Sequence, residues 1–404
     1  MMGAFPRPSE TFIVNQMAGV IEAGHDVHIY ASSRVASEAV DSTVQRYDLM
    51  ARMRHLEIPR NHARRASTAL GYVAKCGLWR RPRLLRHVLD VREHGQHARN
   101  LSLLYTAISF AGNPGYDIVH CQFGDVGARA VALKRGGMID GRLVVSFRGA
   151  DLSRLVKNRP TAYDALFAEA DLFLPVSEQF RQRLISMGCP PERIQVLYSG
   201  INPQRFKAKP RRVESGKQVR LLSIGRLTPK KGFVYGIEAV ARLLKAGYDV
   251  RYTILGEGEL RTELSRRIET HGIETKVDMP GWKGATEVEE YLDWAHLLLA
   301  PCVTADDGDE EGIPNVIKEA MASGMPVVSS IHGGIPELVE HGVSGLLAPE
   351  KEIEALTSCL AQLLDNPQCW PAMGAAGRKR VEDRFDSVRL TDRLIHLYER
   401  LLQP

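Results

Sequence analysis

The sequence predicts an α/β protein with two doubly wound parallel sheets, one in each half of the chain. Short apolar runs alternate throughout with segments of helical periodicity, as they do where strands and helices follow one another in turn. At 404 residues the chain exceeds the usual size of a single domain. Residues 201–217 are rich in Pro, Lys and Arg and lie between two strand-like runs, so they predict the boundary.

Five runs in each half are expected to form strands. In the first half they are 25–31, 116–123, 142–149, 170–177 and 193–200, and in the second half 218–226, 250–258, 276–282, 296–302 and 325–330. Ligands of doubly wound sheets bind at the carboxyl ends of the strands. The residues that follow each run are therefore the candidates for chemistry.

The beginning of the chain departs from this pattern. Residues 11–24 have the periodicity of a helix, with Ser9 as its N-cap and Gly24 at its end. A doubly wound domain has a strand before such a helix, and only the sequence MMGAFPRP precedes this one. We therefore expect the first strand to be missing or replaced, as in a chain that starts late relative to its natural gene product.

Positive charge is concentrated in residues 45–110, which have helical composition and no clear strand. Between Arg46 and Arg99 there are thirteen Lys and Arg against four acids, while the whole chain carries a net charge of +5. The sequence LWRRPRLLRHVL (78–89) mixes basic and apolar residues as membrane-surface helices do. Arginine stems that cover apolar neighbours on a solvated face would give the same pattern. No nucleic-acid motif accompanies the charge.

Composition and cysteine use favour a cytoplasmic protein. The six cysteines are scattered, with no C-x-x-C pair and no metal-ligand spacing, as in a reducing compartment. No apolar run approaches the roughly 18 residues that cross a bilayer, and the start does not resemble a signal peptide. A peripheral position at the inner face of the membrane is expected if the basic segment docks there.

Two carboxylates eight positions apart mark the first candidate site. Glu311 precedes, and Glu319 lies within, a helix expected to begin near Pro314, because proline suits the first helical turn. The N-terminus of that helix would present backbone N–H groups and a positive dipole end to an anion. A phosphate at this helix end, with hydroxyls on the carboxylates, would bind a sugar nucleotide.

A basic turn forms the second candidate site. Gly225, Arg226 and Lys231 belong to the sequence GRLTPKKG (225–232), which follows one expected strand and leads into a helix. Arginine offers a planar fork to a diphosphate and lysine offers a point charge. Such a turn is a weak signal alone, but combined with the two carboxylates it indicates a diphosphate site.

The pairing of GRLTPKKG (225–232) with EGIPNVIKEAMASGMPVV (311–328) resembles the donor domain of retaining family-four glycosyltransferases of GT-B architecture. Four stretches together resemble exopolysaccharide enzymes of the colanic-acid and amylovoran type. They are FPRPSETFI (5–13), SFRGADLS (146–153), PCVTADDGDEEGIPNVIKEAMA (301–322) and HGGIPELVEHGVSGLLAP (332–349). The resemblance covers nearly the whole chain except residues 45–110.

This resemblance implies two Rossmann-like domains that face each other across a cleft. Residues 1–204 would form the acceptor domain and residues 205–385 the nucleotide-sugar donor domain. Residues 386–404 would form a helix that crosses back onto the first domain.

The resemblance also implies roles for the donor-site residues. Arg226 and Lys231 would bind the diphosphate and stabilise the charge of the leaving group. Glu319 would accept hydrogen bonds from the ribose, and Glu311 from hydroxyls of the transferred sugar.

Backbone groups complete this donor site. Gly225, Gly312 and Ile313 would approach the donor closely, since glycine leaves room for a ligand. The base would lie near Trp282, whose own side chain is expected in the core.

In the first half, the resemblance implies a strand end that faces the donor sugar. His120 and Gln122 share one face of that strand, and many relatives have His at both positions. Either His120 carries the function, or Gln122 takes the role with hydrogen bonds but without titration. Arg148 stands where other branches have His, and Asp151 follows it in the acceptor cleft. Asp151 would orient the acceptor hydroxyl or form an ion pair with Arg148.

The function implied is a retaining, metal-independent hexosyl transfer, with His120, Glu311, Arg226 and Lys231 as catalytic candidates. The donor would be a UDP- or GDP-sugar, the acceptor a lipid-linked saccharide in exopolysaccharide or cell-surface polysaccharide synthesis, and no cofactor is expected. The acidic loop 306–310 lacks the spacing of a calcium loop. Two alternatives stay open: a synthase acting on soluble sugars, and a non-catalytic sugar-nucleotide-binding partner of a polysaccharide assembly.

Overall fold

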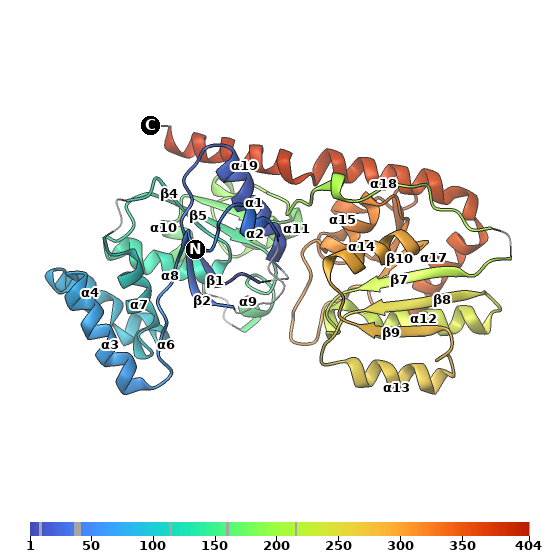
Figure 1. The fold of residues 1–404 in the computed structure, drawn as a ribbon, viewed down its shortest axis with the longest axis horizontal. Coiled ribbons are helices and arrows are strands. Elements are labelled where there is room, and N and C mark those ends of the chain that lie inside the picture. Colours follow the sequence, from blue (N-terminus) through green and yellow to red (C-terminus); the bar gives the residue numbers. More distant parts are fainter. Residues whose placement is uncertain (8–9, 36–41, 113–114, 159–160, 215, 404) are drawn as a thin grey trace.

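The computed structural model describes residues 1–7, 10–35, 42–112, 115–158, 161–214 and 216–403, and its two halves lie side by side (Figure 1). The strands are β1 (Met2–Phe5), β2 (Ile29–Arg34), β3 (Met53–Arg54), β4 (Ile118–Cys121), β5 (Arg142–Phe147), β6 (Leu172–Pro175), β7 (Val219–Ile224), β8 (Val250–Leu255), β9 (Val277–Gly281), β10 (Leu297–Ala300), β11 (Val327–Ser330) and β12 (Gly345–Ala348).

The strands are parallel and helices alternate with them in both halves. Among the described residues, the first half holds two three-stranded sheets, in the orders β1-β2-β3 and β4-β5-β6. The second half holds one six-stranded sheet in the order β12-β11-β10-β7-β8-β9. The sequence therefore predicted the fold class correctly, although it did not indicate β12.

The helices of the first half are α1 (Thr11–Glu22), α2 (Ser42–Arg46), α3 (His62–Lys75), α4 (Pro82–Val88), α5 (Val91–His94), α6 (Gln96–Arg99), α7 (Ser102–Phe110), α8 (Gly124–Arg135), α9 (Arg154–Asn158), α10 (Asp164–Glu169) and α11 (Glu178–Ser186). Those of the second half are α12 (Phe233–Lys245), α13 (Arg261–His271), α14 (Ala285–Trp294), α15 (Asn315–Ala322), α16 (Ile335–Leu338), α17 (Ile353–Asp365) and α18 (Trp370–Arg384), followed by α19 (Ser387–Leu402).

The expectation of a missing first strand is wrong. Met2–Phe5 form β1, which pairs in parallel with β2 from Met2 opposite Ala31 to Phe5 opposite Arg34. The side chains of Met2 and Phe5 are buried, so even four residues with little strand character gain enough contact to pair. The helix that follows is α1 as expected, while Ser9, its expected N-cap, lies outside the described residues.

The basic segment is mainly helical, as its composition indicates, but it is not free of strand. It contains α3 to α7 and the last two residues of α2, together with the two-residue β3 beside β2. Figure 1 shows α3 and α4 projecting from the far end of the first half. The run at 193–200 departs from the expectation in the other direction. It lies beside β6 and pairs with it at a single position, where Ile194 bridges to Phe173, so it forms no full strand.

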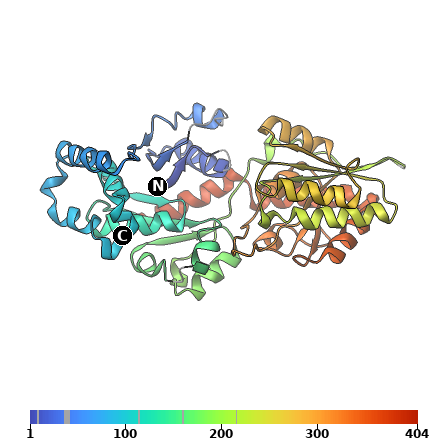
Figure 2. The ribbon, with the colours of Figure 1, turned by 90° about the horizontal axis from the view of Figure 1, so that it is seen from below.

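The two chain crossings between the halves are bonded to each other. The backbone N–H of Ile201 donates to the carbonyl of Phe385 (2.9 Å), and that of Ser387 donates to the carbonyl of Ile201 (2.8 Å). Beyond this point α19 runs back across the first half (Figure 2). Its apolar face, including Leu394, packs with Val144 of β5.

Candidate functional site

The carboxylate of Glu311 lies between two lysines at the carboxyl end of β7. Its Oε1 is 3.2 Å from Nζ of Lys230 and 3.2 Å from Nζ of Lys231. Burial alone would raise the pKa of Glu311, but the charges of Lys231 and Lys230 lower it to about 2. The carboxylate is therefore ionised throughout the neutral range and holds both ammonium groups in place.

Glycines allow the basic turn to fold this tightly. Gly232 has φ +66°, and a Cβ there would lie 1.8 Å from the carbonyl oxygen of Pro301. At Gly225 a Cβ would lie 3.1 Å from Cε of Lys231, so its absence makes room for the lysine stem. The side chain of Arg226 is exposed and, within the described chain, has no hydrogen bond or ion pair. Its guanidinium is thus available to a ligand.

A histidine behind the site fixes the backbone of Glu311. The N–H of Glu311 donates to Nε2 of His332 (3.0 Å), and Nδ1 of His332 lies 2.6 Å from Oε1 of Glu350. The same carboxylate accepts from the backbone N–H of Thr304 (2.6 Å). This arrangement requires the proton of His332 on Nδ1, so that Nε2 accepts.

The helix expected near Pro314 begins there. Pro314 is the N-cap, with extended φ and ψ, and α15 follows from Asn315. Glu319 lies on α15, and burial raises the pKa of its carboxyl despite the charge of Lys318. Among the described residues, the carboxyl group of Glu319 forms neither a hydrogen bond nor an ion pair. It can accept from a ligand that brings hydroxyl donors.

In the first half, both ring nitrogens of His120 already have partners. Nδ1 lies 2.6 Å from the hydroxyl of Tyr398 on α19, and Nε2 lies 2.8 Å from Oγ of Ser146 on β5. Burial and the charge of Arg148 lower the pKa of His120 well below its ordinary value, so the ring is neutral. A substrate would therefore have to replace one of these two hydroxyls.

Gln122 and Arg148 contact each other directly. Nη2 of Arg148 donates to Oε1 of Gln122 (2.7 Å) and of Gln16 (3.0 Å), and Nη1 donates to Oγ of Ser199 (3.0 Å). The guanidinium lies over the ring of Phe12 at 4.9 Å. Burial lowers the pKa of Arg148 to about 10, and its buried Nε has no partner among the described residues.

The carboxylate of Asp151 contacts backbone groups, and its expected role toward an acceptor hydroxyl stays a prediction. Its carboxylate accepts from the backbone N–H groups of Gly124 (3.0 Å), Arg148 (3.2 Å) and Gly149 (2.8 Å). Burial raises its pKa, and these three bonds oppose that rise. The carboxylate thus holds the loop that follows β5 in place, and no ion pair joins it to the guanidinium of Arg148.

The two halves meet at the candidate residues. A Cβ on Gly312 would lie 2.9 Å from Cγ2 of Val176 and 3.4 Å from the carbonyl oxygen of Arg148. Next to it, Nη2 of Arg183 is 3.0 Å from Oε2 of Glu310. The structure therefore brings the Glu311 loop against the Arg148 loop. Ile313 is buried and belongs to the apolar core of the second half.

The expectation that Trp282 lies in the core is wrong. Its side chain is 60% exposed, because β9 ends at Gly281 and the chain turns outward before α14.

The carboxylates of the acidic loop 306–310 face cations: Asp307 lies 3.5 Å from Arg154, and Asp309 lies 3.2 Å from Lys230.

Three buried polar residues near the site escaped the sequence reasoning. Lys318 is fully buried on α15 and donates from Nζ to the carbonyl of Ser199 (2.5 Å). Lys230 completes the pair around Glu311. Glu10 is 8% exposed, and its buried Oε2 has no partner among the described residues. Helical spacing places Lys318 on the inner face of its helix, a signal that was present in the sequence.

Both halves match known protein families. Residues 9–205 match the family described as Glycosyltransferase Family 4, and residues 204–380 match Glycosyl transferases group 1. The amylovoran biosynthesis glycosyltransferase AmsK of Erwinia amylovora is 37% identical over 401 residues, 98% of each chain. The chain therefore belongs to the family of glycosyltransferases that includes AmsK. The putative colanic acid biosynthesis glycosyltransferase WcaL of Escherichia coli is also 37% identical, again over 98% of each chain.

Solved structures confirm the fold of this glycosyltransferase. Anabaena HepE, solved in complex with UDP and glucose, has a TM-score of 0.72 at 18% identity, with 98% of each chain covered. The sucrose-phosphate synthase of Thermosynechococcus elongatus has a TM-score of 0.67 at 16% identity, covering 99% of this chain and 95% of its own. The expected GT-B architecture is confirmed. Of the helices that the structure describes, none has the length and apolar character that a membrane crossing needs.

Proposed function

We propose that this glycosyltransferase moves a hexose, with retention of configuration and without a metal, from a UDP- or GDP-sugar to a saccharide in exopolysaccharide synthesis. The observation that carries the proposal is Glu311, which is held ionised between Lys230 and Lys231 at the carboxyl end of β7. The names of the relatives AmsK and WcaL support the polysaccharide, and the UDP and glucose held by HepE support the donor class.

The donor site is proposed to work by charge stabilisation. The diphosphate would lie against the exposed Arg226, Lys231 and the N-terminus of α15, where positive charge opposes the charge that grows on the leaving group. Glu311 would then exchange part of its contact with the lysines for sugar hydroxyls. Glu319, which has no described partner, would accept from the ribose hydroxyls.

On the acceptor side, positioning is proposed to matter more than proton transfer. In a same-face displacement, a leaving phosphate oxygen takes the acceptor proton, so the protein mainly has to position the donor and the acceptor hydroxyl. His120 would release Ser146 or Tyr398 to face the sugar, while Gln122 and Arg148 would line the acceptor cleft. Asp151 would act through the loop that its carboxylate holds.

A lipid-linked acceptor is proposed because the basic segment carries exposed apolar side chains. Leu70 is 71% exposed on α3 and Trp79 is 58% exposed just before α4, among the arginines of this segment. Such a surface fits the headgroup region of an anionic membrane. The protein would then act at the inner face of the membrane.

Donor hydrolysis tests the proposal. A panel of UDP- and GDP-sugars would be incubated with the purified protein, and thermal shift and release of free nucleotide would be measured. We expect one donor to stabilise the protein and to be hydrolysed slowly. Lys231→Ala and Glu319→Gln should abolish both effects, whereas the exposed controls Lys245→Ala and Glu290→Gln should keep them. Unchanged hydrolysis in both site variants would contradict the site assignment.

Two further outcomes separate the alternatives. Donor binding with neither hydrolysis nor transfer would favour a non-catalytic binding partner, although one reason for that alternative, the missing first strand, is gone. Rapid transfer to free sugars without membranes would favour a synthase that acts on soluble acceptors.

A further inference from the structure

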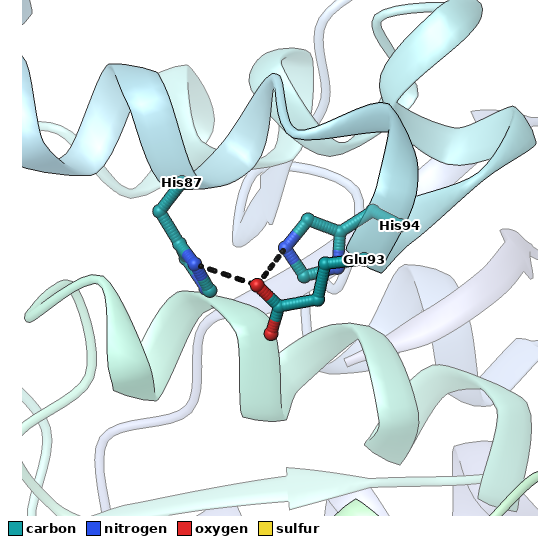
Figure 3. A group of neighbouring side chains, drawn as sticks. All are labelled: His87, Glu93 and His94. Atoms are coloured by element: carbon teal, nitrogen blue, oxygen red, sulfur yellow. Dashed lines mark ion pairs between the residues drawn. The ribbon is translucent and has the colours of Figure 1, made fainter.

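Three metal-ligating side chains meet at the corner between α4 and α5, in the basic segment of the first half. Oε2 of Glu93 lies 3.3 Å from Nδ1 of His87 and 3.8 Å from Nε2 of His94. Figure 3 shows both imidazoles aimed at this one carboxylate oxygen. One ligand atom from each residue lies within 4.8 Å of the other two. The group is separate from Glu311, which belongs to the other half of the chain.

The local backbone holds this corner in place. His87 is in the last turn of α4, and the next residue, Val88, is fully buried in the core of the first half. Asp90 caps α5 by accepting from the backbone N–H groups of Arg92 (2.8 Å) and Glu93 (3.3 Å). The two residues between the helices, Leu89 and Asp90, thus position Glu93 and its neighbour opposite His87.

The surroundings leave the inner atoms available to a cation. Nη1 of Arg135 donates to Oε1 of Glu93 (3.3 Å), which orients the carboxylate and leaves Oε2 facing the histidines. Nε2 of His94 is buried and has no hydrogen-bond partner among the described residues. In the tautomer with its proton on Nδ1, this nitrogen offers a lone pair to a cation.

We propose that His87, Glu93 and His94 bind a Zn²⁺ ion, with water as the fourth ligand. Two imidazoles and one carboxylate are a donor set that Zn²⁺ accepts, whereas Ca²⁺ and Mg²⁺ prefer oxygen atoms alone. The ion would satisfy the buried nitrogen of His94 and join the end of α4 to α5. Its role is structural: it stiffens the outer part of the basic segment and takes no part in glycosyl transfer.

Direct binding tests this site on the full chain without an affinity tag. After treatment with a chelator, the protein would be titrated with Zn²⁺ by calorimetry and with Co²⁺ by visible absorption. We expect one Zn²⁺ per chain and the visible bands of a four-coordinate Co²⁺ site. Because loss of even an outer-shell partner weakens metal sites about tenfold or more, His94→Ala and Glu93→Gln should each weaken binding at least that much.

His97→Ala is the matched control, because His97 is a nearby histidine outside the group, with Nδ1 3.2 Å from Oγ of Ser102. It should bind Zn²⁺ as the wild type does. Circular dichroism would confirm that each variant is folded. Stoichiometric binding that survives in His94→Ala, or no binding above that of free buffer in the wild type, would overturn the proposal. Donor hydrolysis should be unchanged by the chelator.

Discussion

Because of Lys318, the free energy of unfolding of this protein should rise with pH above neutrality. The side chain is fully buried on α15, and its Nζ donates to the carbonyl of Ser199. Burial lowers its pKa from 10.5 to about 7, and the charge of Glu319 offsets only part of that effect. In the unfolded chain the amine returns to its ordinary pKa. The folded state therefore binds fewer protons than the unfolded state between pH 7 and pH 10.5.

The sign and size of the effect follow from this difference. When the unfolded chain holds more protons, the free energy of unfolding increases with pH, by at most about 1.4 kcal/mol per pH unit for one group. Integrated from pH 7 to pH 9, the shift of Lys318 contributes roughly 2 kcal/mol. Below pH 7 the folded state also becomes protonated, so this contribution to the slope fades.

Urea unfolding at pH 7, 8 and 9, followed by tryptophan fluorescence, measures this contribution. Lys318→Met removes the titrating group and keeps a long apolar side chain in the buried position. The free energy of unfolding of the wild type should rise from pH 7 to pH 9 by about 2 kcal/mol more than that of the variant. The exposed control Lys245→Met should retain the wild-type slope. Equal slopes in the wild type and Lys318→Met would refute the reasoning.

Three more predictions concern other parts of the molecule. Glu311→Gln leaves the ammonium group of Lys231 without a carboxylate, while Lys230 keeps Asp309, so unfolding by urea at pH 7 should show a loss of roughly 3 kcal/mol. The wild-type advantage should shrink as the pH falls from 4.5 toward 2, where the carboxylate becomes protonated. Gly232→Ala places a methyl group on the carbonyl of Pro301 and should lower stability by about 2 kcal/mol or more. Gly247→Ala, also at positive φ but in open space, should lower the stability less. Urea unfolding at pH 7 would measure the free energy of unfolding of both glycine variants. Trp79→Ala should weaken cosedimentation with phosphatidylglycerol vesicles roughly tenfold without changing the melting temperature.

The sequence indicated the architecture because periodicity reports which residues are buried. It failed at β1 and β12, where four-residue strands containing glycine gain their stability from the neighbouring strands and not from their own composition. Trp282 shows the same limit, since a large apolar residue after a strand is exposed when the chain turns outward.

The candidate site was predictable in its position and not in its partners. The motifs placed Glu311 and Lys231 at the carboxyl end of one sheet, where the structure joins them. One of the two hydroxyls that contact His120 comes from Tyr398, far along the chain, and no local sequence pattern indicates such a contact. Asp151 likewise takes backbone partners that only the folded loop brings within reach.

The paired crossings at Ile201 and Phe385–Ser387 have a mechanical consequence. Because the two segments are hydrogen-bonded to each other, we expect them to bend together as one hinge when the halves move. Opening of the two halves would then carry α19, and with it Tyr398, along with the first half and away from the second half. Because α19 packs on the first half, Tyr398 and His120 would move together relative to Glu311.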